Sequence, residues 1–110
     1  MKVNFSDSNL EEFCTTGKSK KSAYKKYVRD GAFMRALARA LSAFVYAPNT
    51  AFLRDNYSFL HYERLTDNMS GRSSVRIMNG RVERLIFTES EEGIEIEILE
   101  LNTTHYGNKK

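Results

Sequence analysis

The hydrophobic period of this 110-residue chain changes near its middle, from the period of helices to that of strands. Between residues 31 and 47, apolar residues recur at spacings of three and four, which predicts an amphipathic helix. Between residues 73 and 101, apolar and polar residues alternate, which predicts strands buried on one face. Helices followed by strands are typical of a two-layer α+β domain. We therefore expect two N-terminal helices to pack on a three- or four-stranded antiparallel sheet.

Residues that begin or end helices support both predicted helices. Asp7 or Ser8 can cap a short helix over residues 8–16. Gly17 ends this helix, because glycine adopts the left-handed conformation at little cost. Pro48 ends the second helix. The basic segment between the two helices either starts the second helix or forms a loop before it.

Turn residues divide the second half of the chain into strands. We expect a short strand over residues 57–62 and a hairpin with strands at 73–77 and 81–88. The Asn-Gly dipeptide at 79–80 predicts a two-residue type I′ turn, in which both central residues have positive φ. A last strand is predicted over 94–101, where isoleucines alternate mainly with glutamates. Together these strands form an antiparallel meander.

Length and composition predict one soluble domain over residues 1–110. Hydrophobic residues make up 41% of the chain and charged residues 28%, which argues against disorder. No apolar run reaches the roughly 18 residues that span a membrane, and the first five residues do not resemble a secretory signal. We therefore expect a cytoplasmic protein with no membrane partner. The only cysteine, Cys14, excludes an internal disulfide, and without further soft ligands we expect no metal site.

Charge is segregated along the chain, although the net charge is only +3. Residues 17–45 carry eight basic residues against one acid, 72–84 carry four arginines against one glutamate, and 89–100 carry six glutamates and no base. Segregated positive charge predicts a cationic face, and nucleic acid is the commonest cytosolic polyanion. Alternatively, the lysines only solvate a helix surface. The lysines predicted to bind RNA are Lys18, Lys20, Lys21, Lys25 and Lys26.

Two arginines of the predicted hairpin fall on one face of the sheet. If the apolar residues of both strands point at the helices, Arg76 and Arg84 lie side by side on the opposite face. Such a pair is tolerated more readily when an anion lies between its members. His105 and Tyr106 follow the last strand and His61 lies in the first, so imidazoles that titrate near neutrality are available for acid–base catalysis. This set fits metal-independent RNA cleavage, with arginines that stabilise the phosphorane-like charge.

A structural explanation of the same residues is also open. Arg76 and Arg84 can form surface salt bridges with Glu95 or Glu97, which contribute little to stability. In that case each histidine is an ordinary surface or strand residue, and Tyr106 only packs against an edge of the sheet.

Several stretches of the chain, taken in order, are similar to one protein family. The segment from Phe5 to Gly17 looks like the family's opening helix motif, and the helix with Leu37 and Leu41 looks like its second helix. His61-Tyr62-Glu63-Arg64-Leu65 is followed by the hairpin over 75–87, with an arginine on each strand around Asn-Gly. Residues 94–101 resemble the family's last strand, and His105 falls where the family ends in an Asp-Tyr-His type motif. The chain thus resembles the RelE/ParE superfamily of bacterial toxins, and most closely its HigB branch.

This resemblance implies a type II toxin–antitoxin toxin that cuts mRNA in the ribosomal A site. Its nucleophile is the 2′-OH of the mRNA, it uses no metal or other cofactor, and its product is a cyclic phosphate. A HigA-like helix-turn-helix antitoxin holds it inactive. By motif match, His105 is the leading general acid or base, His61 is the second candidate, and Arg76 and Arg84 contact the phosphate. Tyr106 completes the expected catalytic set, and the arginines expected to bind RNA are Arg64, Arg72 and Arg81.

Near the expected site the chain departs from the family pattern. Thr103-Thr104 replaces the Asp-Tyr before the terminal histidine, and the tyrosine instead follows as Tyr106. Glu83 stands where the family often has an aromatic residue. These departures leave open a ParE-like toxin that binds DNA gyrase without cleaving RNA, or a degenerate module that acts only through its antitoxin.

Overall fold

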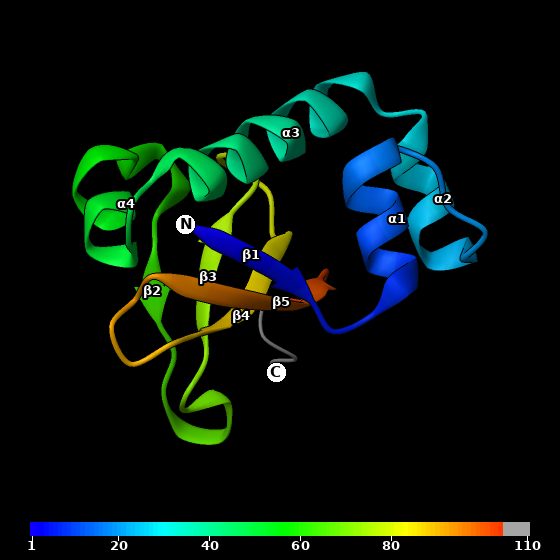
Figure 1. The fold of residues 1–110 in the computed structure, drawn as a ribbon. Coiled ribbons are helices and arrows are strands. Elements are labelled where there is room, and N and C mark those ends of the chain that lie inside the picture. The colour runs from blue at the N-terminus through cyan, green and yellow to red at the C-terminus, as the bar shows by residue number, and fades with distance from the viewer. Residues whose placement is uncertain (105–110) are drawn as a thin grey trace.

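The structure, a computed structural model, describes residues 1–104 and has the expected two-layer α+β architecture (Figure 1). Helices cover one face of a five-stranded mixed sheet within these residues. The helices are α1 (Ser8–Thr16), α2 (Ser22–Val28), α3 (Gly31–Tyr46) and α4 (Thr50–Asn56). The strands are β1 (Lys2–Phe5), β2 (Glu63–Arg64), β3 (Ser73–Arg76), β4 (Arg84–Glu89) and β5 (Glu95–Asn102). No helix among residues 1–104 is long and apolar enough to cross a membrane.

Local signals correctly predicted α1 and α3. The Asp7 side chain accepts a hydrogen bond from the Asn9 amide, which satisfies a donor at the first turn of α1. Gly17 ends this helix in the left-handed conformation, with a φ of 73°. The apolar stripe of α3 is buried against the sheet, and its members include Phe33, Leu37 and Phe44.

Three segments differ from the expectation. Residues 22–28 form a separate helix, α2, and α4 occupies residues 50–56, where no helix was expected. The predicted strand over 57–62 is wrong, because Ser58–Leu60 is a short 3-10 helix, η1, and His61 follows it in a left-handed conformation with a φ of 50°. Polar and apolar residues alternate briefly at 57–62, as they do in a strand, but Leu60 is fully buried as part of a helical turn.

The sheet has the order β1-β5-β4-β3-β2, and its first pair is parallel. The expected all-antiparallel meander is therefore corrected to a mixed sheet with an extra strand at the N-terminal end of the chain. In β1, Lys2 pairs with Glu95 and Phe5 with Ile98. This pairing joins the two ends of the described chain, so no local pattern could reveal it.

The β3–β4 connection is longer than the predicted turn, and the predicted strand over 81–88 begins only at Arg84. The Arg81 amide donates to the Met78 carbonyl, which closes a turn around Asn79 and Gly80. Gly80 has a φ of 81°, but Asn79 has no positive φ, so the turn is not type I′. After the turn, the side chains of Arg81 and Glu83 bond to α2 and the start of α3, which keeps residues 81–83 out of the ladder.

The two faces of the sheet have different surroundings. Residues of odd number in β3 and β4 face the helices, where Val75, Leu85 and Phe87 are fully buried. Residues of even number, including Arg76 and Arg84, lie on the opposite face, which we call the outer face. An irregularity in the β4–β5 register beside Ile86 and Phe87 brings Glu100 and Asn102 to the outer face as well.

Candidate functional site

Arg76 and Arg84 are direct cross-strand partners on the outer face, as the sequence predicted. Arg84 is in turn paired with Asn102 of β5, so the three residues form one row across the sheet. The next row contains Glu63, Ser74, Ile86 and Glu100. The side chains of two arginines therefore leave the sheet from adjacent positions, with one glutamate on either side in the neighbouring row.

Arg84 is a buried and well-held member of this pair. Only 6% of its surface is exposed. Its Nη1 donates to the backbone carbonyls of Arg81 and Val82, both at 3.1 Å, and to that of Glu83 at 3.4 Å. The irregular segment before β4 thus wraps around the guanidinium and fixes its direction.

Arg76 differs from Arg84 in its bonding. It is half-buried, and its Nε is buried without a hydrogen-bond partner among residues 1–104. Of the ion pairs within that segment, none includes Arg76. The expected alternative, a salt bridge to Glu95, is not formed there, since the Glu95 carboxylate bonds to Asn4 at 2.8 Å and lies 4.0 Å from Lys2. Among residues 1–104 no carboxylate neutralises this half-buried cation, so its accessible part is suited to bind an anion.

Sequence reasoning did not single out the two glutamates beside the arginines. Glu63 lies on β2 opposite Ser74, and Glu100 lies on β5, where it accepts a hydrogen bond from Asn102 at 2.9 Å. The alternation of side chains along strands could have identified Glu63, because Glu63 shares the face of Arg76 once β2 is paired with β3. It was missed because the two-residue strand β2 was not expected at residues 63–64.

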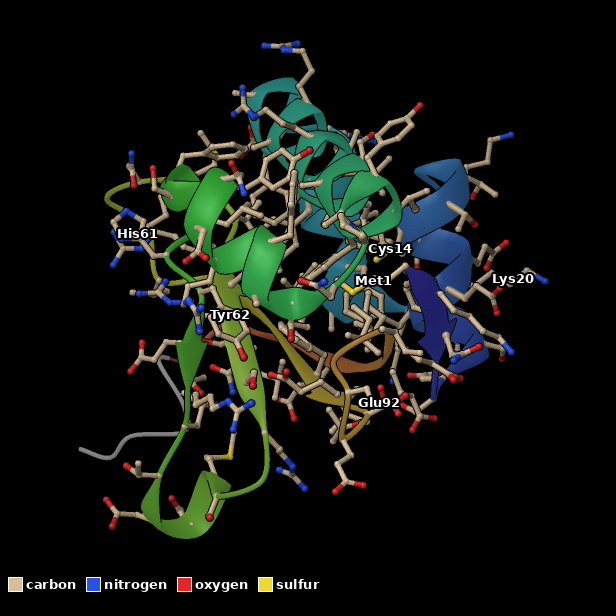
Figure 2. All side chains as sticks on the ribbon, turned by 60° about the vertical axis from the view of Figure 1, so that its left-hand side comes forward. Met1, Cys14, Lys20, His61, Tyr62 and Glu92 are labelled. Atoms are coloured by element: carbon tan, nitrogen blue, oxygen red, sulfur yellow. The ribbon has the colours of Figure 1, made fainter. Side chains whose placement is uncertain are left out.

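The expected catalytic histidines and tyrosine are only partly described. His61 is exposed and lies two residues before β2, on the part of the chain that η1 holds against β3 (Figure 2). If the β2–β3 pairing continued backward along the chain, His61 would lie opposite Arg76, but the left-handed conformation of His61 prevents this. His105 and Tyr106 lie outside the described residues, so their roles stay predictions.

Arg64 lies on the helix side of the sheet, away from the arginine pair. Its Nη2 is 3.7 Å from the Glu89 carboxylate, and its side chain is 76% exposed. Tyr62 is turned inward (Figure 2), and its hydroxyl donates to Glu89, as do those of Thr50 at 2.7 Å and Ser73 at 2.6 Å. Burial raises the pKa of Glu89, but the hydroxyl donors and the Arg64 charge outweigh it and hold the pKa below its usual value.

Arg72 lines a polar hollow together with Arg64, between the β2–β3 loop and the end of β4. Its Nη1 contacts the Met69 sulfur at 3.5 Å. The hollow also presents Ser73, Glu89 and Glu91. The structure therefore places Arg64 and Arg72 together, but not with Arg76 and Arg84.

Arg81 is engaged within the protein. It forms a pair of 3.1 Å hydrogen bonds with the Glu83 carboxylate, and its Nη1 lies 2.9 Å from Asp30. These bonds hold the pKa of the Asp30 carboxyl below its usual range, with the Arg81 hydrogen bond as the main cause. The expected contact of Arg81 with RNA stays a prediction.

The five predicted lysines are exposed on α2 and on the loop before it. Lys21 and Lys26 line a hollow with Leu101 and Thr103 at the end of β5, beside the row that contains the arginines. Lys18 and Lys25 line another hollow next to Arg29, and Lys20 projects from the loop (Figure 2). Part of the lysine-rich segment thus lies next to the end of β5. Among residues 1–104, no three His, Cys, Asp or Glu side chains gather as a metal site requires.

Comparison with known proteins relates this chain to solved structures, whereas no family model and no curated protein matches its sequence. It superposes on the YoeB–YefM toxin–antitoxin complex of Staphylococcus aureus with a TM-score of 0.51 and 17% identity, over 93% of this chain and 94% of that one. It also superposes on a YoeB/ParE toxin from Agrobacterium tumefaciens with a TM-score of 0.50 and 15% identity, over 94% and 98% of the two chains. The chain has the fold of these toxins. A shared fold at this identity leaves its activity to be argued from the site.

Proposed function

We propose that this protein is the toxin of a type II toxin–antitoxin system and that it is a ribosome-dependent endoribonuclease acting on mRNA. The fold that it shares with YoeB and ParE toxins supports the toxin assignment. The cross-strand pair of arginines supports the activity, because two adjacent cations favour a bound anion and the Arg76 Nε has no hydrogen-bond partner among residues 1–104. A phosphate of an RNA backbone that binds the accessible part of this pair offsets the repulsion between the two cations.

The proposed reaction needs no metal or other cofactor. The ribose 2′-OH gives its proton to a general base while its oxygen attacks the adjacent phosphorus and forms the 2′,3′-cyclic phosphate, and the 5′-oxygen leaves with a proton from a general acid. Arg76 and Arg84 stabilise the negative charge that develops on the phosphate oxygens. Proton transfer is assigned to His105, with His61 as the second candidate and Tyr106 as the last member of the predicted catalytic set. Glu63 and Glu100 are the carboxylates of the outer face next to this centre.

Basic residues around the site extend the proposed RNA path. Lys21 and Lys26 lie beside the end of β5 and can neutralise neighbouring phosphates. The other predicted lysines continue this surface along the loop before α2. Their proposed role is electrostatic and independent of sequence, since exposed lysines contact phosphates more often than bases.

We further propose a cytoplasmic location and a HigA-like helix-turn-helix antitoxin as the partner. The YoeB structure from Staphylococcus aureus was solved with YefM, which supports a toxin–antitoxin pair in general. The HigB assignment rests on the sequence motifs, in particular the hairpin with one arginine on each strand.

One observation favours a second candidate, a non-catalytic toxin that binds DNA gyrase. Arg84 is buried and its Nη1 already donates to three backbone carbonyls, which is also the expected bonding of a structural arginine. On this alternative, the arginine pair stabilises the outer face and the toxin acts through a protein surface.

Primer extension on a cellular transcript after induction of the protein separates the two candidates. The nuclease proposal predicts new 5′ ends that disappear in Arg76→Ala and His105→Ala. Arg35→Ala, an exposed arginine on the opposite layer, is the matched control and keeps both the cuts and the growth arrest. Growth arrest without new 5′ ends, undiminished in Arg76→Ala and His105→Ala, contradicts the nuclease proposal.

A further inference from the structure

The Arg81 side chain is held by contacts from several parts of the fold. Its Nε and Nη2 donate to the two oxygens of Glu83, each at 3.1 Å. Its Nη1 donates to Asp30 at 2.9 Å, and its guanidinium lies 5.2 Å from the centre of the Phe33 ring. Asp30 also caps α3 by accepting from the Phe33 amide. Arg81 therefore ties the β3–β4 connection to the start of α3.

Glu83 completes this tie from the side of α2. Its side chain is only 10% exposed, and it accepts a 3.0 Å hydrogen bond from the Tyr27 hydroxyl. Burial raises the pKa of Tyr27 to about 12, and the hydrogen bond to Glu83 acts in the same direction, so the phenol stays a donor. The carboxylate of Glu83 is thus satisfied by Arg81 and Tyr27 together.

The backbone that these side chains hold is the one that surrounds Arg84. Within residues 1–104, the three carbonyls that accept from Arg84 Nη1 belong to residues 81–83. The Glu83 carbonyl also accepts a 3.4 Å hydrogen bond from the Ile77 amide at the end of β3. The residues before it lie outside the β-ladder, so the sheet does not fix where the Arg81 and Val82 carbonyls point. We infer that their direction depends on the side-chain contacts of Arg81 and Glu83.

We propose that Arg81 and Glu83 are positioning residues that aim the Arg84 guanidinium at the RNA phosphate. This inference rests on the proposed function, in which Arg84 contacts the phosphate. It assigns to Arg81 an indirect role, in place of the direct RNA contact that its charge suggests. The planar fork of arginine is required, since a lysine cannot bond both oxygens of Glu83 and Asp30 at once. A displacement of about 1 Å at a phosphate contact is enough to lower activity up to about 100-fold.

A double-mutant cycle tests whether Arg81 acts through Arg84. Binding of a short single-stranded RNA to the full chain is followed by fluorescence anisotropy for Arg81→Lys, Arg84→Lys and the double variant. We expect Arg81→Lys to weaken binding about tenfold in the wild-type background and to have almost no effect in the Arg84→Lys background. Equal effects in both backgrounds mean that Arg81 contacts RNA directly and overturn the proposal. Arg35→Lys, on the exposed side of α3, is the matched control and leaves the affinity unchanged.

A second measurement reads the position of Arg84 without RNA. The Nε–Hε resonance of Arg84 is followed by NMR in protein labelled with ¹⁵N-arginine. Arg81→Lys is expected to shift or broaden this resonance, and Tyr27→Phe, which removes one hydroxyl and keeps the ring buried, is expected to do so more weakly. An unchanged resonance in a folded Arg81→Lys variant overturns the proposal. If Arg84→Lys leaves RNA binding intact, the proposed RNA site fails, and this resonance alone then decides whether Arg81 positions Arg84.

Discussion

Replacement of Arg76 by methionine is expected to weaken RNA binding and to stabilise the fold at the same time. The Arg76 Nε is buried without an acceptor among residues 1–104, and an unsatisfied polar group of this kind costs about 1–3 kcal/mol. The direct pairing with Arg84 adds a repulsion of up to about 1 kcal/mol. Methionine keeps the apolar stem but removes both the unsatisfied Nε and the repulsion with Arg84. We therefore expect Arg76→Met to raise the free energy of unfolding by about 1–2 kcal/mol.

The two effects are measured separately. Urea unfolding followed by circular dichroism gives the stability, and the gain corresponds to a rise in melting temperature of about 4 °C per kcal/mol for a chain of this size. Anisotropy with a short RNA gives the affinity, which should fall about tenfold or more because a charge-assisted phosphate contact is lost. The slope of log K against log salt should also become shallower by about 0.7, since one fewer phosphate is neutralised.

The control is Arg35→Met, which changes an exposed arginine of α3 and should alter neither the stability nor the affinity for RNA. A loss of stability in Arg76→Met would show that the guanidinium is satisfied within the protein. Unchanged affinity for RNA would show that Arg76 does not contact phosphate. Either result refutes the reasoning that an arginine without an acceptor marks the anion site.

Three other predictions concern the pH, salt and backbone dependence of the protein. Glu89→Gln should lower the free energy of unfolding by about 1–3 kcal/mol in urea titrations, because an amide cannot accept from Tyr62, Ser73 and Thr50 together. The pKa of Glu89 is lowered in the folded state, so its contribution to the free energy of unfolding is complete above the ordinary glutamate pKa of about 4.3. That contribution is lost as the pH falls through the lower pKa of the folded state. If Glu89→Gln loses as much stability in acid as the wild type, this reasoning is refuted. Gly93→Ala should destabilise the fold by more than Gly80→Ala, although both residues have positive φ, since only at Gly93 would a Cβ come within 2.5 Å of the Thr50 hydroxyl; equal melting temperatures would contradict it. RNA affinity should fall steeply between about 50 and 200 mM salt, and a flat response would exclude a phosphate-binding role for the lysines.

The parts of the fold that follow from neighbouring residues were predictable. Asp7 and Gly17 delimit α1 by capping chemistry that acts within one helical turn. The apolar stripe of α3 and the alternation in β3 and β4 assign each residue to a face before any partner is known. The adjacency of Arg76 and Arg84 follows from this alternation once the two strands form a hairpin. This part of the candidate site was therefore available from the sequence.

Long-range contacts explain what was missed. Asn4 of β1 bonds to Glu95 of β5, 91 positions further along the chain, so the parallel edge strand has no local signal. The helix α4 begins at Thr50, whose amide and hydroxyl bond to Gly93 and Glu89. Glu63 reaches the outer face only because β2 pairs with β3. Each of these elements depends on a partner that the chain meets only after folding.

The sequence by itself determined that the chain forms an α+β domain with Arg76 and Arg84 on one face of its sheet, because hydrophobic period is a local property of the chain. Tertiary structure alone decided which arginine serves which purpose. Arg81 finds Asp30, 51 positions away, and the buried Glu83, while the buried Nε of Arg76 finds no acceptor among residues 1–104. Both side chains carry the same charge in the same hairpin. Their difference arises because the fold brings acids and a tyrosine from other elements to one of them and leaves the other facing away from the helices.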